Sequence, residues 1–292
     1  NSEDNVELHL NEITVNYKNL PGATPVAMPI IPGSKFLNMV GNFSDVSLKP
    51  IPKPFRTLVN SKIYNVETGF QINDCINVKI ESFDIDLEYQ GSGVSNYTIK
   101  TNTNSTGIVY NNFGIQANYI DHSAVTNNTI LHAKSGIQLF HTQIDIVNNT
   151  ILDLNDDTGV PQGCFPGPCY ATPSWGIRAV NSQPIITENK VYNNLNNYPT
   201  SDPSANTKVV GIELDNSTSW NPTVSCNNIE YTGVAMKFTG DNSGGEILKN
   251  KMNDHTVGFL LHQNGVVGNV GSSGNASQNQ WTGSYSKSNT FA

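Results

Sequence analysis

The 292-residue chain has few charged side chains and no long apolar run. Charged residues make up 14% of it, against about 25% in a typical soluble domain. Asn, Ser, Thr and Gly take their place, which favours a turn-rich β protein over long helices. No apolar run reaches the roughly 18 residues of a membrane-spanning helix, so we predict no transmembrane segment. The net charge of -8 and the lack of any Lys/Arg cluster argue against a nucleic-acid partner.

The four cysteines form no CxxC pair, and no HExxH motif is present, so the usual metal-binding motifs are missing. Cys164 and Cys169 lie in "GCFPGPCY", where prolines and a glycine can fold the loop back; they are the candidate disulfide, which would favour an oxidising compartment. Cys75 and Cys226 lie in apolar runs, and we expect them to be small buried hydrophobes. The start at Asn1, with neither initiator Met nor signal peptide, suggests a segment of a longer chain.

Two short signatures alternate along the chain. The first is Gly followed by an apolar, a variable and an apolar or small residue, and it begins at Gly69, Gly114, Gly136, Gly176, Gly211, Gly233 and Gly258. The second has Asn in its fourth place, as in "VTNNTI" and "IVNNTI", and its asparagines are Asn128, Asn149, Asn189, Asn227 and Asn250. Each signature is a short stretch of period-two alternation that ends at a turn former, which predicts a strand with one buried face.

Such short strands, recurring in one register, predict an all-β solenoid of parallel coils stacked about 4.8 Å apart. We expect the repeated Asn to adopt the left-handed conformation of a tight corner and to hydrogen-bond its equivalents in neighbouring coils. We expect the Gly to open a second corner with positive φ. Glu81 stands in for Asn in the first coil, and an additional coil is expected around "GIVY".

"NNTI" alternating with "GIQL" resembles the repeat of single-stranded right-handed parallel β-helix proteins of the pectate-lyase-like type. The resemblance covers residues 69–270 and implies this fold there. Residues 1–68 are then expected to form an N-terminal cap and irregular first coils, and residues 271–292 a C-terminal closing segment. The tail's "NQWTG" is similar to segments that close β-helical stretches in large secreted surface proteins of the Bacteroidetes. The architecture serves lyases, hydrolases, epimerases, tailspikes, adhesins and stalks, so it selects no single function.

The repeats differ in length at one corner. The step from Asn to the next Gly is 8, 6 and 8 residues in three repeats, but 27 after Asn149, 22 after Asn189 and 33 after Glu81. We therefore predict loops at 82–112, 151–174 and 192–209 on one face, which in solenoids is often the binding face. The candidate ligand-binding residues of these loops are Tyr89, Asp153, Asp156, Asp157, Tyr170, Trp175, Tyr192 and Tyr198.

The acidic residues of these loops are candidate ligands for calcium, the one cofactor that the sequence suggests. Asp84, Asp86 and Glu88 offer hard oxygen ligands, with the three loop aspartates in support. The aromatic residues could stack on sugar rings. The alternative is that the acids are solvated turn residues and the aromatics hold the loops against the solenoid wall.

Candidates for catalysis are few, because Arg56 and Arg178 are the only arginines. Arg178 lies in a Gly signature and is either a functional cation or one half of a surface ion pair. "YIDHS" resembles the Asp-Pro-His motif of β-helical alginate epimerases but lacks the proline. With His141 from the next coil, Asp121 and His122 could form an Asp/His/His patch.

These observations favour a non-catalytic secreted or cell-surface module for display or adhesion, whose loop-bearing face binds glycan or protein. One alternative is a polysaccharide lyase, hydrolase or epimerase. The other is a subunit of a larger bacterial cell-envelope complex. Each of the three implies an extracellular or cell-surface location.

Overall fold

The computed structural model describes residues 7–10, 35–40, 47–50, 61–64, 68–73, 78–86, 106–111, 123–154, 174–193, 209–217, 221–272 and 275–283. These residues form β-strands joined by short turns, and no helix is found among them. The protein is therefore all-β in the described part, as its composition predicts. None of the described segments is a helix that could cross a membrane.

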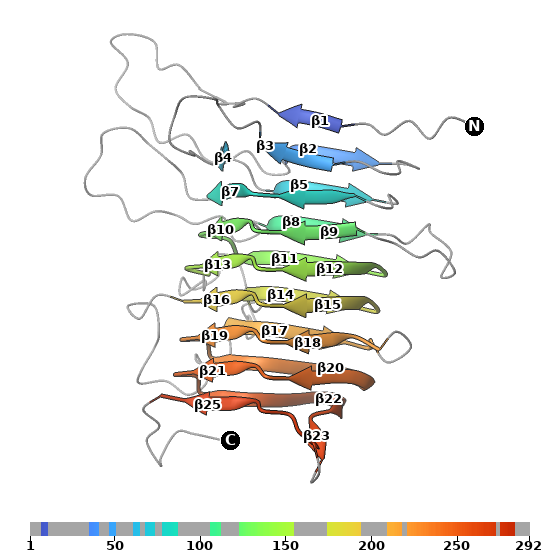
Figure 1. Cartoon of the computed structure of the whole chain (residues 1–292), viewed down its shortest axis with the longest axis vertical. Helices are drawn as coiled ribbons and strands as arrows, with labels where there is room; N and C mark the ends of the chain where they lie inside the picture. The colour runs from blue at the N-terminus through green and yellow to red at the C-terminus, as the bar shows by residue number, and fades with distance from the viewer. Residues whose placement is uncertain are drawn as a thin grey trace, which may run out of the picture.

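Most strands lie in three stacks, in each of which neighbouring strands pair in parallel (Figure 1). The chain passes through the three stacks in a fixed cyclic order. The first stack contains β2 (Lys35–Val40), β5 (Thr68–Asn73), β8 (Thr106–Asn111), β11 (Ser135–Phe140), β14 (Ser174–Val180), β17 (Val209–Asp215), the first half of β20 (Val234–Leu248) and β22 (Val257–Asn269). The second contains β1 (Glu7–Leu10), β3 (Ser47–Pro50), β6 (Lys79–Glu81), β9 (Ser123–Thr126), β12 (Gln143–Val147), β15 (Gln183–Thr187), β18 (Thr223–Ser225) and the second half of β20.

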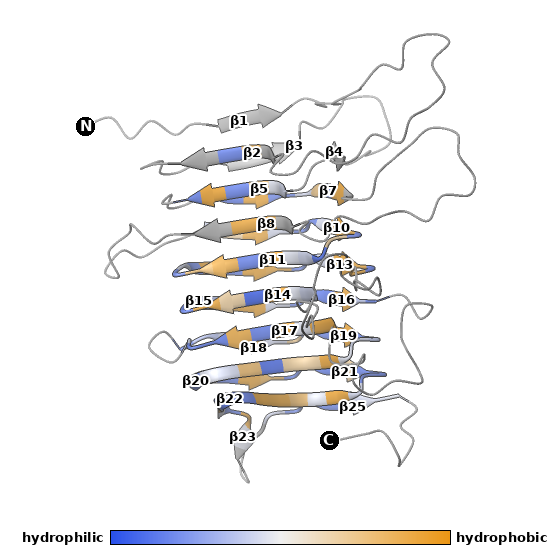
Figure 2. Ribbon diagram, turned by 180° about the vertical axis from the view of Figure 1, so that it is seen from behind, coloured by the Kyte–Doolittle hydropathy of each residue, from blue (hydrophilic) through white to orange (hydrophobic). Residues whose placement is uncertain are grey.

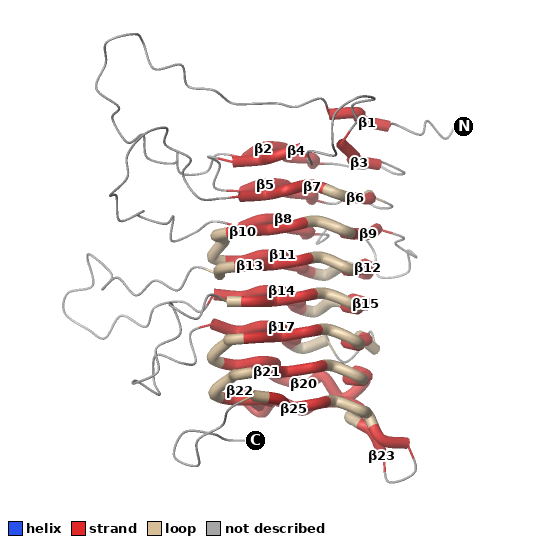
Figure 3. Tube along the Cα trace, turned by 60° about the vertical axis from the view of Figure 1, so that its left-hand side comes forward, coloured by secondary structure: helices blue, strands red, loops and turns tan. Residues whose placement is uncertain are grey.

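The third stack is a separate eight-stranded sheet. It contains β4 (Ser61–Tyr64), β7 (Phe83–Asp86), β10 (Thr129–Leu131), β13 (Thr150–Leu152), β16 (Lys190–Tyr192), β19 (Asn228–Glu230), β21 (Lys251–Asn253) and β25 (Gln280–Thr282). One strand from each stack, taken in chain order, makes one repeat, and Figure 3 shows the repeats lying one above another. A small antiparallel hairpin, β23 (Gly271–Ser272) with β24 (Asn275–Ala276), lies between the last two parallel strands in the chain.

Period-two alternation places the apolar residues between the stacks. In β12 and β15 every second residue is buried and the others face outward. In the third stack Ile130, Ile151, Val191, Ile229 and Met252 pair in register and are fully buried. Figure 2 shows hydrophobic residues, in orange, recurring along strands of successive repeats. Stacking identical positions buries a continuous apolar core that no single repeat could bury alone.

The Asn column forms as predicted, but its asparagines are not the left-handed residues. In each of these repeats the residue just before the column Asn has positive φ, and these residues are Asn127, Asn148, Glu188, Cys226 and Lys249. They project outward and are exposed, whereas the column Asn that follows each one is buried. The column extends one member further than predicted, because Asn279 accepts a bond from Asn250.

The expected role of the glycines is also wrong. Gly136, Gly176 and Gly211 do not have positive φ. They are required by space instead: a Cβ on Gly176 would lie 2.5 Å from the carbonyl oxygen of Gly211 and 2.6 Å from Cγ1 of Val191. At Gly233 the predicted signature is out of register, because Val234 pairs with Val210 and places Ala235 opposite Gly211.

Three further sequence interpretations need correction. Glu81 pairs with Thr126, two residues before the column, and the column position is taken by Phe83, whose N–H donates to Asn128 Oδ1. The additional coil at "GIVY" is present as β8, so segment 82–112 is not one loop, since it contains both β7 and β8. Cys226 is an exposed free thiol at a corner and not a buried hydrophobe. Cys75, Cys164 and Cys169 lie outside the described residues, so the disulfide stays a prediction.

Candidate functional site

The corner between the third and first stacks is where the repeats differ in length. In three repeats the connection is short, at 132–134, 231–233 and 254–256. Undescribed segments at 87–105, 155–173 and 194–208 occupy the same place in the chain order, after β7, β13 and β16. The strand order therefore agrees with the prediction that the insertions leave the repeats at one corner, because all three long connections follow strands of the third stack. The first stack's strands β14 and β17 begin directly at this corner.

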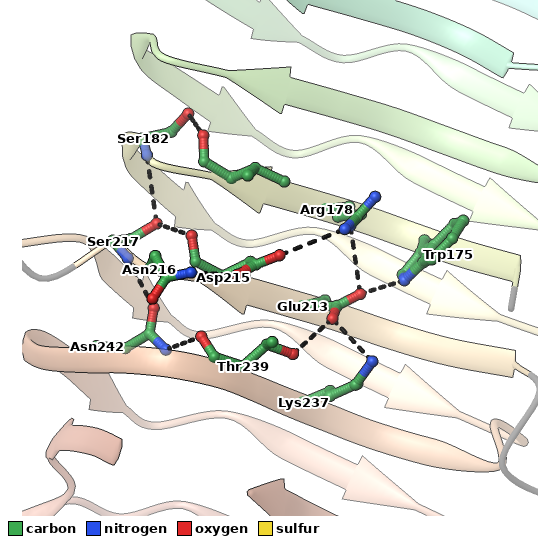
Figure 4. A network of polar contacts seen from close by, with 11 residues as sticks. Trp175, Arg178, Ser182, Glu213, Asp215, Asn216, Ser217, Lys237, Thr239 and Asn242 are labelled. Atoms are coloured by element: carbon green, nitrogen blue, oxygen red, sulfur yellow. Dashed lines mark hydrogen bonds and ion pairs between the residues drawn. The ribbon is translucent and has the colours of Figure 1, made fainter. Parts of the chain in front are cut away.

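A buried carboxylate lies on the outward face of β14, β17 and β20 (Figure 4). Glu213 alternates with the inward residues Ile212 and Leu214, so its side chain projects away from the core. It is nevertheless only 2% exposed, because side chains of neighbouring repeats surround it. Its strand partners in register are Arg178 on one side and Lys237 on the other.

Both carboxylate oxygens of Glu213 are engaged. Lys237 Nζ lies 2.9 Å from Oε1, and the hydroxyl of Thr239 donates to the same oxygen across 2.8 Å. The indole N–H of Trp175 donates to Oε2. Arg178 Nε lies 3.4 Å from Oε2 but is not aligned as a hydrogen-bond donor to it. Two cations and two neutral donors therefore hold one carboxylate.

Arg178 joins this carboxylate to a second one and to an aromatic ring. Its Nη2 lies 3.3 Å from Asp215 Oδ2, and its guanidinium carbon lies 4.8 Å from the ring centroid of Trp175. A guanidinium at this distance from an indole ring is in cation–π range. Of the two alternatives for Arg178, the ion pair is the one the geometry contains. The four charged groups Arg178, Lys237, Glu213 and Asp215 together carry no net charge.

A second polar ladder fixes the strand ends beside this cluster. Ser182 N donates to Ser217 Oγ across 3.3 Å, and Ser217 N donates to Asn242 Oδ1 across 3.0 Å. Asn242 Nδ2 in turn donates to the carbonyl of Thr239. Figure 4 shows these bonds leading into the Glu213 cluster. Ser217 Oγ also donates to the carbonyl of Asp215 across 3.3 Å, so the ladder holds the backbone of both Asp215 and Thr239, which pair in register.

Several predicted site residues lie at corners, apart from this cluster. His141 is an exposed left-handed corner residue at the end of β11. Asp153 lies at the corner after β13, with its carboxylate 3.9 Å from His132 Nε2. Tyr192 packs edge-on against Tyr231, with ring centroids 5.3 Å apart. Trp175 is thus the predicted ligand-binding aromatic that the structure places in the cluster.

The remaining candidates are not brought together by the described residues. Asp84 and Asp86 belong to β7. No group of three His, Cys, Asp or Glu side chains that could hold a metal is found in the described ranges. The other candidates lie outside the described residues, and these are Glu88, Tyr89, Asp121, His122, Asp156, Asp157, Tyr170 and Tyr198. The calcium site and the Asp/His/His patch therefore stay predictions.

Two titrating side chains lie near the same corner, further toward the C-terminus. Burial lowers the pKa of His255 from 6.5 to about 4, and the nearby Asp254 carboxylate opposes this shift in part. Burial, followed by the charge of Asp254, raises the pKa of Tyr231 above 10.0. Neither side chain contacts the Glu213 cluster in the interactions described above.

Sequence reasoning did not identify four residues of the cluster, namely Glu213, Asp215, Lys237 and Thr239. A signal for one pair existed: Arg178 and Glu213 occupy the same place, two residues after the Gly, in consecutive repeats. Lys237 gave no such signal, because the Gly233 signature is out of register. Comparisons of the chain with protein-family models, with curated proteins and with solved structures give no match.

Proposed function

We propose that the chain is a single right-handed parallel β-helix that serves as a non-catalytic display or adhesion module at a bacterial cell surface or outside the cell. The cyclic visiting order of the three stacks supports the winding. Right-handed crossing between parallel strands, the rule in nearly all known cases, supports the hand. The sequence resemblance to pectate-lyase-like repeats points the same way.

The observation that carries the non-catalytic assignment is the state of Glu213. Polysaccharide hydrolysis typically needs a pair of carboxyl groups, one that protonates the leaving oxygen and one that either activates a water or attacks as the nucleophile. Both oxygens of Glu213 are already held by four side chains, and Asp215 is held by Arg178. The cluster therefore suits holding a surface in shape better than acid–base chemistry.

The proposed contact surface is centred on Trp175, at the corner where the insertions leave. A half-buried indole beside a guanidinium offers a flat apolar face with a polar edge, which suits a sugar ring or an aromatic side chain. Because the surrounding charges cancel, we expect neutral glycans to bind better than acidic ones. The hydrogen bond from Trp175 to Glu213, together with the ion pairs of Arg178 with Glu213 and Asp215, fixes the orientation of this surface before any ligand arrives, which reduces the entropy lost on binding.

A panel of neutral and acidic polysaccharides tests this proposal, with and without Ca²⁺, measuring binding by calorimetry and product release by reducing-end and unsaturated-uronate assays. NMR of the recovered polymer detects epimerisation. We expect binding of a neutral polymer without turnover. Release of oligosaccharides or unsaturated products, or inversion of a sugar centre, would establish the enzyme alternative. Copurification with envelope proteins and no glycan binding would favour the envelope-complex alternative.

Matched variants separate the ring from its surroundings. Trp175→Ala should reduce affinity by about tenfold, the equivalent of roughly 1.4 kcal/mol. Trp175→Phe loses the hydrogen bond from the indole N–H to Glu213 but keeps an aromatic ring, and because the ring provides the contact, this variant should retain most of the binding. Ile185→Ala removes an exposed apolar side chain from the second stack and serves as the control. Equal losses in Trp175→Ala and Ile185→Ala would place the contact elsewhere.

A further inference from the structure

The apolar core is open at the C-terminal end of the described stacks. Leu261 pairs with Phe238 of the repeat before, and Trp281 pairs with Met252. Phe238 and Met252 are 2% and 0% exposed, whereas Leu261 and Trp281 are 54% and 44% exposed. The last repeat therefore presents to solvent the positions that the earlier repeats bury wherever their burial is described, as at Leu139, Leu214 and Ile229. Val266 and Val270 of the same repeat are exposed as well.

The backbone of the last repeat is also open on this side. Among the described strands, β22 pairs with β20 alone and β25 with β21 alone. The Asn column ends here too: Asn279 Oδ1 accepts from Asn250, and among the described residues no further Asn accepts from Asn279 in the same way. Two edge strands and an exposed apolar column thus lie on one surface, which we call the end face (β22 and β25, with Leu261, Val266, Val270 and Trp281).

The last repeat, which forms the end face, contains no charged residues. Residues 257–283 contain no Asp, Glu, Lys or Arg, although the preceding residues 234–256 contain six of them. Natural proteins usually protect exposed strand edges with Lys, other charges or Pro, and none of these is present in 257–283. In a chain of net charge -8, this is a surface on which two copies can meet without repulsion between like charges.

We propose that the end face binds a second copy of this chain, end to end about a two-fold axis perpendicular to the direction of stacking. Such an axis brings each face against itself, so complementarity of charge must be self-complementarity, which an uncharged face satisfies. It also sets the edge strands of the two copies antiparallel, a pairing that β-strands accept readily.

The outline of the end face fits this arrangement. The hairpin β23–β24 projects beyond β22 and β25 on one side of the end (Figures 1 and 3). A two-fold axis that does not pass through this hairpin sets the hairpins of the two copies apart from each other. The contact buries Leu261 and Trp281 of both copies. The second copy thus covers the apolar residues of the last repeat, as each repeat covers those of the repeat before it. This dimer is independent of the ligand surface around Trp175.

Sedimentation equilibrium of the whole chain over a concentration series tests the proposal. The expected species at high concentration has twice the 31.7 kDa mass of the chain. Leu261→Lys and Val266→Lys each place a charge on the end face and should shift the dimer to monomer by at least tenfold in Kd. Ile185→Lys places the same charge on an exposed apolar residue of the second stack and should leave the dimer unchanged. Circular dichroism confirms that each variant keeps its β structure.

Three results would overturn the proposal. A wild-type chain that stays monomeric up to roughly 1 mM, where even weak pairs associate, has no such contact. Species that keep growing beyond two copies indicate an open, head-to-tail contact in place of a two-fold one. A dimer that survives Leu261→Lys and Val266→Lys, or is lost in Ile185→Lys, uses another surface. Glycan binding by the monomeric variants is measured in parallel, so failure of either proposal is read separately.

Discussion

Asn149 donates from both its backbone N–H and its side-chain Nδ2 to the single Oδ1 of Asn189, across 2.9 and 3.0 Å. Asn189 does the same to Asn227 in the next repeat. Four members of the column also donate to two main-chain carbonyls each, as Asn189 does to Ile146 and Thr187, and these members are Asn128, Asn149, Asn189 and Asn227. The column is therefore a directional ladder in which every member satisfies buried donors of the repeat before it. Losing one member leaves the buried backbone N–H of the member before it without an acceptor.

Asn189→Ala should lower the free energy of unfolding by about 3 kcal/mol. The substitution leaves the buried backbone N–H of Asn149 without its acceptor, which costs about 1–3 kcal/mol, and removes the bonds that Asn189 Nδ2 donates to Ile146 and Thr187. Urea unfolding followed by circular dichroism measures the change. A loss of less than about 0.5 kcal/mol, the size typical of a surface substitution, would contradict the ladder's role.

The neighbouring corner residue provides the opposite prediction. Glu188 is exposed and has φ of 59°, a conformation that costs a non-glycine residue about 1–2 kcal/mol. Glu188→Gly should therefore leave stability unchanged or raise it by up to about 1 kcal/mol. A destabilisation as large as that of Asn189→Ala would mean that the Glu188 side chain, and not its backbone, matters.

These two residues show what sequence reasoning could and could not reach. The Asn column was predictable, because Asn recurs at one place between apolar residues. The left-handed residue was assigned one place too late, because the true positions hold residues as different as Asn127, Glu188 and Cys226. Backbone conformation there is imposed by stacking of the flanking strands, so it leaves no consistent residue type in the sequence.

Gly176→Ala should destabilise the protein by about 2 kcal/mol or more. The new methyl would overlap the Gly211 carbonyl oxygen at 2.5 Å and Val191 at 2.6 Å, and the strand cannot move away without breaking its register. Gly245→Ala is the control, because its nearest neighbours lie at 3.3 Å. Thermal unfolding of both variants measures the difference. Equal unfolding midpoints would contradict the packing role assigned to Gly136, Gly176 and Gly211.

The Glu213 cluster should show energetic coupling between Glu213 and Lys237. Glu213→Gln leaves Lys237, whose side chain is 14% exposed, beside a neutral group, and should cost about 2 kcal/mol. Lys237→Met should lower stability less in the Glu213→Gln background than in the wild-type chain. A double-mutant cycle in urea should give a coupling energy of about 1 kcal/mol. Lys251→Met, at an exposed position, is the control, and additive effects would contradict the ion pair.

The site was less predictable than the fold for a physical reason. Arg178 was identifiable because arginine is rare in the chain, but the carboxylates that it contacts come from β17, and the other two partners of Glu213 come from β20, so the cluster spans three repeats. Which residues become neighbours across repeats depends on register, and one misread glycine at Gly233 displaced the third repeat by two places. The charge cancellation in this cluster is therefore a property of the stacking and not of any local motif.

His255 should make stability depend on pH between about 6.5 and 4. The side chain is 3% exposed, and its pKa of about 4 lies below the usual 6.5 chiefly because burial disfavours the charged form. The unfolded chain then binds the proton more readily, so the stabilisation is complete above pH 6.5 and is lost as the pH falls toward 4. The shift corresponds to roughly 3 kcal/mol. His255→Gln should remove that part of the pH dependence in urea unfolding, and His262→Gln, at an exposed position, is the matched control. An unchanged slope in His255→Gln would show that this histidine is not the group responsible.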